Sequence, residues 1–202
     1  MLSLTVAGLL LFSRVNAADI YKIDPVHTSI TFSVRHLGIS NVKGQFKDFA
    51  GLIVVENKSI TDARGTIQIK SVDTGFLQRD DHLRSADFFD AANYPTITFK
   101  TRRIKKKPVF TRHKLPDGRI TIVADFTMRG VTRELRLPAK ATGPTKDPSG
   151  NLRIGLVAKG KLNRKDYGIN FHQISEAGNL LVGEEVEFEI SAEGIKATSR
   201  DN

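Results

Sequence analysis

The stretch Ser29-Ile30-Thr31-Phe32-Ser33-Val34-Arg35-His36 alternates apolar side chains with hydroxyl or charged ones. A repeat of two residues is typical of a β-strand with one buried face. The same alternation returns in Val186-Glu187-Phe188-Glu189-Ile190 and, more briefly, at 67–69, 97–99, 120–122, 135–137 and 154–156. The sequence therefore predicts a sheet with one apolar face.

Short turn signals separate these segments, for example Pro116-Asp117-Gly118, Arg129-Gly130 and Gly178-Asn179. Connections of this length join antiparallel neighbours, because a parallel pair needs a crossover of about a dozen residues or more. Only residues 75–92 carry apolar residues at helical spacing. We therefore expect an all-β antiparallel fold with one short helical insertion at about 75–92.

Strands with one apolar face must either close into a barrel or split into two packed sheets. Glycines interrupt the apolar positions at Gly44, Gly51, Gly65, Gly155 and Gly160, where barrel strands bend or leave inner space unfilled. An eight-stranded barrel that holds one small apolar ligand fits this pattern, and so does a sandwich with a filled core. The pattern alone leaves both architectures open.

The inner face is predicted from the apolar positions, since the alternate ones carry charges such as Arg35, Lys47, Lys70, Arg136 and Glu187. In a barrel these inner side chains would contact the ligand. They are Ile30, Phe32, Val34, Phe46, Ile53, Ile67, Ile69, Ile97, Phe99, Ile122, Phe126, Leu135, Leu156, Phe188 and Ile190.

The composition is that of one globular domain, with 202 residues, 40% of them hydrophobic and 26% charged. Cysteine is absent, which excludes disulfides, thiolate nucleophiles and cysteine-ligated metals. The net charge of +9 favours anionic partners or surfaces.

Residues 1–17 read as a signal peptide, because the apolar run from Leu2 to Phe12 is followed by the small-residue site Val15-Asn16-Ala17. No lysine or arginine precedes that run, so the true start codon is left open. Residues 18–202 are expected to form a single domain, exported to a bacterial periplasm.

Several motifs occur in a characteristic order. They are Asp24-Pro25-Val26-His27-Thr28-Ser29, Val42-Lys43-Gly44-Gln45-Phe46, Arg79-Asp80-Asp81-His82-Leu83-Arg84-Ser85-Ala86-Asp87-Phe88-Phe89-Asp90, Tyr94-Pro95-Thr96, Met128-Arg129-Gly130-Val131-Thr132 and Arg164-Lys165-Asp166-Tyr167-Gly168. From about Tyr21 to Ile195 the chain closely resembles the YceI-like family of bacterial periplasmic polyisoprenoid-binding proteins.

The resemblance implies an extended, lipocalin-like antiparallel barrel that holds a long isoprenoid, a quinone-type lipid or a related aliphatic chain. It implies binding and carriage without catalysis, with no cofactor beyond the bound lipid. A strand of about ten residues is roughly 33 Å long, so an apolar interior can sheath much of an extended prenyl chain. Such a wall discriminates poorly between tails that differ by a few carbons.

Polar candidates gather near the insertion. We expect Arg79, Asp81 and His82 to tie it to the barrel rim, with His27 and His36 as further rim residues and Phe88 and Phe89 as a lid. Contact with a ligand headgroup is the alternative role for these polar residues. A metal site is not expected, since no histidine pair has the spacing of a motif such as HExxH. Neither a GxSxG elbow nor a phosphate loop is present, so no catalytic residue is predicted.

The segment 100–107 is strongly basic. It is interpreted either as a contact with anionic membrane lipids or as a solvated hairpin. Nucleic acid is not expected, because no aromatic residue interleaves these charges. A homodimer is left open. The alternative function is a cationic surface-interaction module that binds anionic envelope components and has a filled barrel core.

Overall fold

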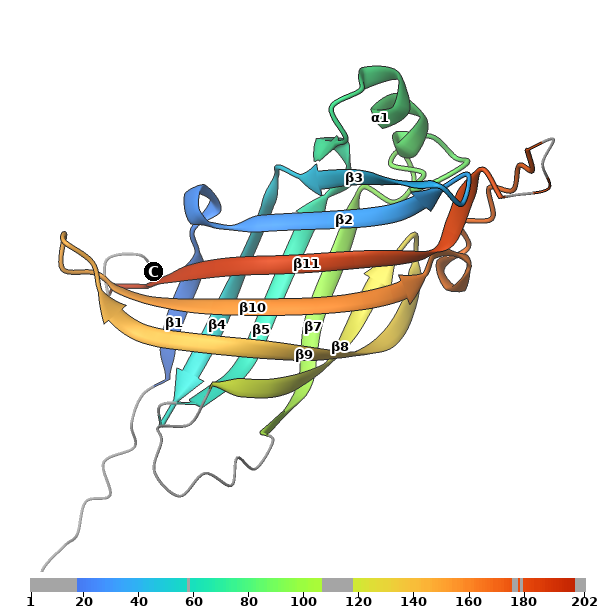
Figure 1. Ribbon diagram of the computed structural model, residues 1–202. Coiled ribbons are helices and arrows are strands. Elements are labelled where there is room, and N and C mark those ends of the chain that lie inside the picture. The colour runs from blue at the N-terminus through green and yellow to red at the C-terminus, as the bar shows by residue number, and fades with distance from the viewer. Residues whose placement is uncertain (1–17, 58, 107–117, 176–177, 179, 199–202) are drawn as a thin grey trace, which may run out of the picture.

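The computed structural model describes residues 18–57, 59–106, 118–175, 178 and 180–198, so the predicted signal peptide lies outside the described residues. Strands dominate (Figure 1). They are β1 Asp19–Ile23, β2 Ser29–His36, β3 Ser40–Phe46, β4 Phe49–Glu56, β5 Ser59–Gln68, β6 Val72–Asp73, β7 Thr96–Lys106, β8 Arg119–Met128, β9 Val131–Lys146, β10 Leu152–Asn163 and β11 Val182–Lys196.

The helical elements are short. They are the 3-10 helices η1 Pro25–His27, η2 Ile69–Ser71 and η3 Arg164–Tyr167, and the α-helix α1 Leu77–Arg84. Within the described residues, no helix is long and apolar enough to cross a membrane.

Every strand pairing is antiparallel, and the sheet closes on itself. Hydrogen bonds join β1, β4, β5, β7, β8, β9, β10 and β11 in that order, and β11 pairs with β1 through Tyr21 opposite Lys196. The predicted all-β, lipocalin-like barrel of about eight strands is thereby confirmed, and the sandwich alternative is wrong.

Three of the eight barrel strands are each interrupted once. Strands β1 and β2 lie one after the other along β11, because Ile23 is opposite Gly194 and Ile30 is opposite Ile190. In the same way β4 and β3 continue one another, and β5 continues into β6, which pairs with β3. The eleven strand segments therefore make up the eight strands of the barrel.

Local sequence explains the first interruption. Asp24 caps η1 by accepting a hydrogen bond from the Val26 amide at 3.0 Å, and Pro25 supplies the first helical position. Proline cannot donate to a ladder, so the strand pairing stops there. The second and third interruptions adjoin each other, since the amide of Lys47 bonds to the carbonyl of Ser71 in η2.

The predicted position of Ile69 in a strand is wrong, because β5 ends at Gln68 and Ile69 begins η2. Its side chain is nevertheless fully buried. A bulge between Thr101 and Arg103 shifts the register of β7, so Ile104 comes opposite the inner residue Ile122.

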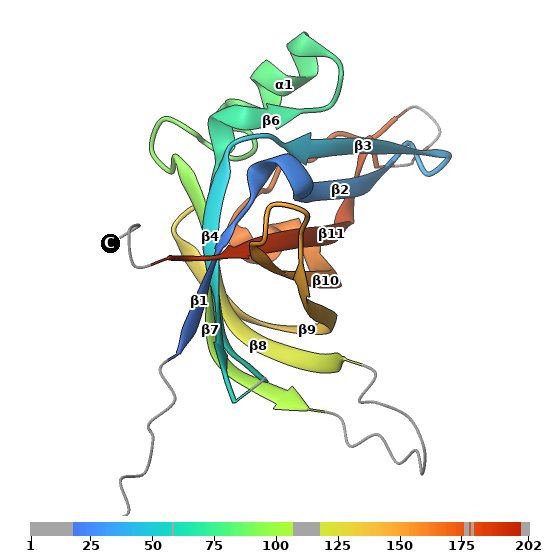
Figure 2. The ribbon, with the colours of Figure 1, turned by 90° about the vertical axis from the view of Figure 1, so that its left-hand side faces the viewer.

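The helical insertion lies between β6 and β7, at the predicted place. It consists of α1 and the turns that follow it. In both ribbon views α1 lies on the side of β3 that faces away from β2, and Figure 2 shows it next to β6 (Figures 1 and 2). We call the segment 75–95 the lid, because its side chains cover one end of the barrel core, as described next.

Candidate functional site: the barrel interior

Two apolar cavities lie inside the barrel. The lid-side cavity has a volume of about 120 Å³ and is lined by Leu83, Phe88 and Phe89 of the lid together with Met128 and Leu162. The far cavity has a volume of about 90 Å³ and is lined by residues from the other half of the barrel, including Ile53, Ala63, Gly65, Leu137, Leu156 and Ala158. The buried core is divided in the same way into two clusters.

The residues predicted to face inward line these cavities, with two exceptions. Phe32, Val34, Phe46 and Phe188 line the lid-side cavity, and Ile53, Phe99, Ile122 and Leu156 line the far one. Both cavities are lined by Ile30, Ile67, Ile97, Phe126 and Ile190. Ile69 and Leu135 pack in the core without lining either cavity.

Aromatic rings close the lid end. Phe88 is buried, and its ring centroid lies 4.8 Å from that of Phe171. Phe89 packs edge-on against Phe46 at 5.9 Å. The ring of His82 lies edge-on to Phe88 and Phe171, so this histidine is part of the aromatic cover.

Hydrogen bonds fasten the lid to the barrel wall. Asp80 is 6% exposed and accepts bonds from the amide and hydroxyl of Thr74, the residue that directly follows β6, at 2.9 and 2.6 Å. Arg79 donates to the hydroxyl and carbonyl of the same threonine. Arg84 donates to the carbonyls of Lys70 and Val72, which belong to η2 and β6.

The predicted contact of Asp81 with the rim is wrong. Its carboxylate is exposed and pairs with Arg84 at 2.7 Å, within the same helix. The buried neighbour Asp80 makes the tie instead, because the first turn of α1 faces Thr74. From the β8–β9 turn, Arg129 also donates to the carbonyls of Ala86 and Phe88. The sequence did not predict these roles of Asp80 and Arg129, although both residues lie in the motifs quoted above.

A buried arginine stands beside the lid-side cavity. Arg164 is 3% exposed, lines this cavity, and donates to the carbonyls of Gly183, Ile169 and Val182 at 2.7 to 3.1 Å. Burial lowers its pKa. Tyr167 of the same short helix is 1% exposed, and burial raises its pKa to about 12. Sequence reasoning assigned no role to either residue.

A charged cluster lies at the first interruption, where β1 gives way to η1. The guanidinium of Arg153 contacts Asp24, Asp147 and Glu193 at 2.8, 2.7 and 2.6 Å. His27 Nδ1 lies 2.8 Å from Asp24 Oδ2. The His27 and Arg153 contacts hold the pKa of Asp24 at about 2, and Arg153 does the same for Asp147.

Of the two histidines predicted at the rim or lid, His27 does not lie at the lid, because it joins this cluster with Arg153 of β10 and Asp147 of the β9–β10 hairpin. His36 ends β2, opposite Ser40 and Val182. The ligand atoms of Asp24, His27 and Glu193 all lie within 4.8 Å of one another, a spacing that a metal ion would accept. Arg153 already supplies the positive charge there, so this set does not point to a cation site.

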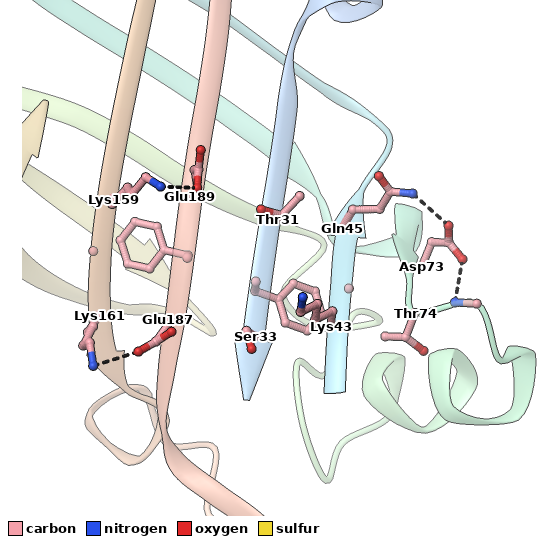
Figure 3. A pocket seen from close by; sticks show the side chains of 15 residues that line it. Thr31, Ser33, Lys43, Gln45, Asp73, Thr74, Lys159, Lys161, Glu187 and Glu189 are labelled. Atoms are coloured by element: carbon pink, nitrogen blue, oxygen red, sulfur yellow. Dashed lines mark hydrogen bonds and ion pairs between the residues drawn. The ribbon is translucent and has the colours of Figure 1, made fainter. Parts of the chain in front are cut away.

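A groove of about 880 Å³ runs along the outer face of β10, β11, β2 and β3 (Figure 3). Thr31 and Ser33 lie between two rows of charged or polar side chains. One row holds the pairs Lys159–Glu189 and Lys161–Glu187, each at 2.8 Å, and the other holds Gln45 and Asp73. The charged side chains of the first row pair with one another and Gln45 bonds to Asp73, so this polar groove does not match an aliphatic ligand.

The described part of the basic segment 100–107 lies on β7. Arg102 pairs with Asp125 at 2.7 Å and lies 3.9 Å from Glu134, whereas Arg103 and Lys105 are exposed. Lys107 lies outside the described residues.

The sequence profile of the YceI-like domain matches residues 21–194. The chain belongs to this family. It is 37% identical over 201 residues to the protein YceI of Escherichia coli O157:H7, with 97% of each chain covered.

Solved structures share the fold. The YCEI protein of Campylobacter jejuni is 28% identical and superposes with a TM-score of 0.66, covering 81% of this chain and 90% of that one. A polyisoprenoid binding domain from Saccharophagus degradans, implicated in plant cell wall breakdown, also has a TM-score of 0.66, at 16% identity over 88% of this chain and 98% of that one. The two cavities therefore lie inside a barrel of the YceI-like fold.

Proposed function

We propose that this protein binds and carries a long-chain lipid, such as a polyisoprenoid or a quinone-type lipid, inside its barrel in the bacterial periplasm, without catalysis. The observation that carries the proposal is the apolar lining of the two interior cavities. The fold shared with a polyisoprenoid binding domain supports the same ligand class.

Cavity size bears on how such a ligand binds. An apolar cavity of about 150 Å³ holds a molecule as small as benzene, so a tail of many carbons needs more room than cavities of about 90 and 120 Å³ provide. Lining side chains must rotate to admit it. Each methylene that leaves water then contributes on the order of 0.8 kcal/mol.

The chemistry of the lining supports carriage over catalysis. Among the described residues that line the two cavities, no aspartate, glutamate, histidine or lysine occurs. General acid–base catalysis needs such a group within hydrogen-bond reach of the substrate. A ligand held here would meet mainly aliphatic and aromatic side chains, together with Arg64, Arg164 and a few threonines.

The rival function is a cationic module that binds anionic envelope components and has a filled core. The presence of cavities weighs against the filled core, and the outer lysines Lys159 and Lys161 are already paired with carboxylates. Contact of segment 100–107 with anionic membrane is compatible with carriage, because it would bring the barrel to the source of its lipid.

The test is extraction of bound lipid. The full chain is expressed in a bacterial host, purified without detergent and extracted with organic solvent, and the extract is analysed by mass spectrometry. A long-chain lipid in near-stoichiometric yield supports the proposal. Absence of lipid under several expression conditions, together with no uptake of a prenol presented in detergent, would contradict it and favour the rival.

A further inference from the structure

We propose that the barrel interior consists of two binding compartments separated by a movable partition, and that the partition sets how affinity depends on tail length. The compartments are the lid-side and far cavities, and the partition is the set of five side chains that line both: Ile30, Ile67, Ile97, Phe126 and Ile190. This inference rests on the proposed function.

The partition is built from direct cross-strand pairs. Ile30 of β2 lies opposite Ile190 of β11, and Ile67 of β5 lies opposite Ile97 of β7. Phe126 of β8 completes it, in register with Phe99. Side chains directly opposite each other on one face of a sheet are in contact, so each pair forms one continuous part of the boundary that the two cavities share.

The partition lies at the level where the wall is interrupted. Ile30 is the second residue of β2 after the η1 break, and Ile67 stands two residues before η2. Three of the five residues, Ile30, Ile67 and Ile190, are only partly buried, whereas Ile97 and Phe126 belong to the buried core. The three partly buried side chains therefore have more room to change rotamer than side chains in the tightly packed core.

The far compartment depends on a glycine pair. Gly51 and Gly65 lie opposite each other in β4 and β5, and both line this cavity without a side chain. A Cβ atom at residue 65 would meet only the carbonyl oxygen of Ala50, at an ordinary 3.6 Å. A larger side chain at this position therefore fills the far compartment without a backbone clash.

The arrangement predicts a stepped dependence of affinity on chain length. While a chain fills the lid-side compartment, each added methylene should tighten binding about fourfold. Carbons that must displace the partition should add little. The gain in affinity per methylene should return to about fourfold once the chain enters the far compartment. A single uniform tube would give equal increments throughout.

The experiment measures the dissociation constants of straight-chain alcohols of rising length by displacement of a fluorescent apolar probe. The variant Gly65→Leu blocks the far compartment. It should leave short alcohols within about twofold of the parent and weaken long ones at least tenfold. Thr121→Leu is the matched control, since it adds the same side chain to a β8 position that lines neither cavity and should change nothing.

The partition itself is tested with Phe126→Ala and, because that change removes a large buried ring, with the smaller change Ile67→Ala. In either folded variant the flat part of the length series should disappear. Equal increments in the parent, or equal weakening of short and long alcohols by Gly65→Leu, would overturn the partition alone. Failure of the parent to bind any alcohol or prenol would overturn the proposed function as well.

Discussion

Gly160 of β10 lies directly opposite Phe188 of β11, and a Cβ atom at residue 160 would stand 2.5 Å from the tip of that phenylalanine ring. Gly44 and Phe32 repeat the arrangement across β3 and β2, at 2.3 Å. Each ring thus occupies the room that its glycine leaves on the inner wall. These glycines are needed for packing, because neither has a backbone angle that requires glycine.

Replacing Gly160 by alanine should therefore destabilise the protein by about 1 to 3 kcal/mol, since the added methyl group forces the Phe188 ring away. Urea unfolding followed by circular dichroism measures the change. The neighbouring Lys159→Ala removes an exposed ion pair and should cost under about 1 kcal/mol. Equal stability of the two variants would show that the ring moves at no cost.

The lid can be tested through its two phenylalanines. Replacing Phe88 and Phe89 by alanine should lower stability by about 3 to 5 kcal/mol for the buried Phe88 and by less for the half-buried Phe89, and should loosen lipid retention. Melting temperature and lipid content after dialysis are the measurements. Phe76→Ala, at a residue that is 54% exposed, is the control. Unchanged melting temperature and lipid content in the double variant would show that these lid residues neither stabilise the barrel nor retain the lipid.

Arg164 should be intolerant of conservative change. One ammonium group cannot reach the three carbonyls that the guanidinium fork binds, so Arg164→Lys should destabilise by about 3 kcal/mol or more. Differential scanning calorimetry checks this. Lys165→Met, which removes a neighbouring exposed ion pair, should have a small effect. A stable lysine variant would mean that the carbonyls find other donors.

Arg153 links stability to pH. Because the pKa values of Asp24 and Asp147 are depressed to about 2, their contribution is present above the unfolded value near 4 and is lost as the pH falls toward 2. Arg153→Met should lower stability at neutral pH and flatten the stability profile between pH 4 and 2. Unfolding midpoints measured across that range decide the matter. Parallel profiles for parent and variant would contradict the assignment.

The basic segment on β7 should affect the rate of lipid uptake more than affinity, because charge attraction acts on the encounter with the membrane. Changing the exposed Arg103 and Lys105 together to glutamine should slow uptake from anionic vesicles, and added salt should slow the parent. Lys159→Gln with Lys161→Gln removes the same charge from β10 and serves as the control. Equal uptake rates for the parent, the β7 variant and the β10 control at low salt would show that the basic segment is a solvated surface feature without a role in uptake.

Much of the barrel was predictable because a two-residue period specifies both the strands and their inner face. Phe32, Phe99 and Phe188 line the interior as expected, since no bulge separates them from their pattern. Ile69 departed from its strand because the chain turns into η2. That turn depends on tertiary contacts, such as the bond from the Ile69 amide to the carbonyl of Pro95.

The charged contacts were less predictable. Asp24 and Arg153 meet only because the barrel closes, and no spacing in the sequence relates residues so far apart. Asp80 and Asp81 are adjacent and chemically identical, so the choice of which is buried depends on the orientation of α1 against Thr74. The division of the interior into two compartments likewise depends on pairs drawn from four strands, β2, β11, β5 and β7.

The pairing of β1 with β11 joins segments from opposite ends of the domain. Contacts so distant in sequence make folding slow, because a long loop must close before they form. Until β11 has been synthesised and brought into place, β10, β1 and β2 each lack a neighbour and expose an edge that other chains can pair with. Sealing the barrel is therefore a late event in its biogenesis, and a lipid present earlier would meet an open curved sheet whose apolar face is directly accessible.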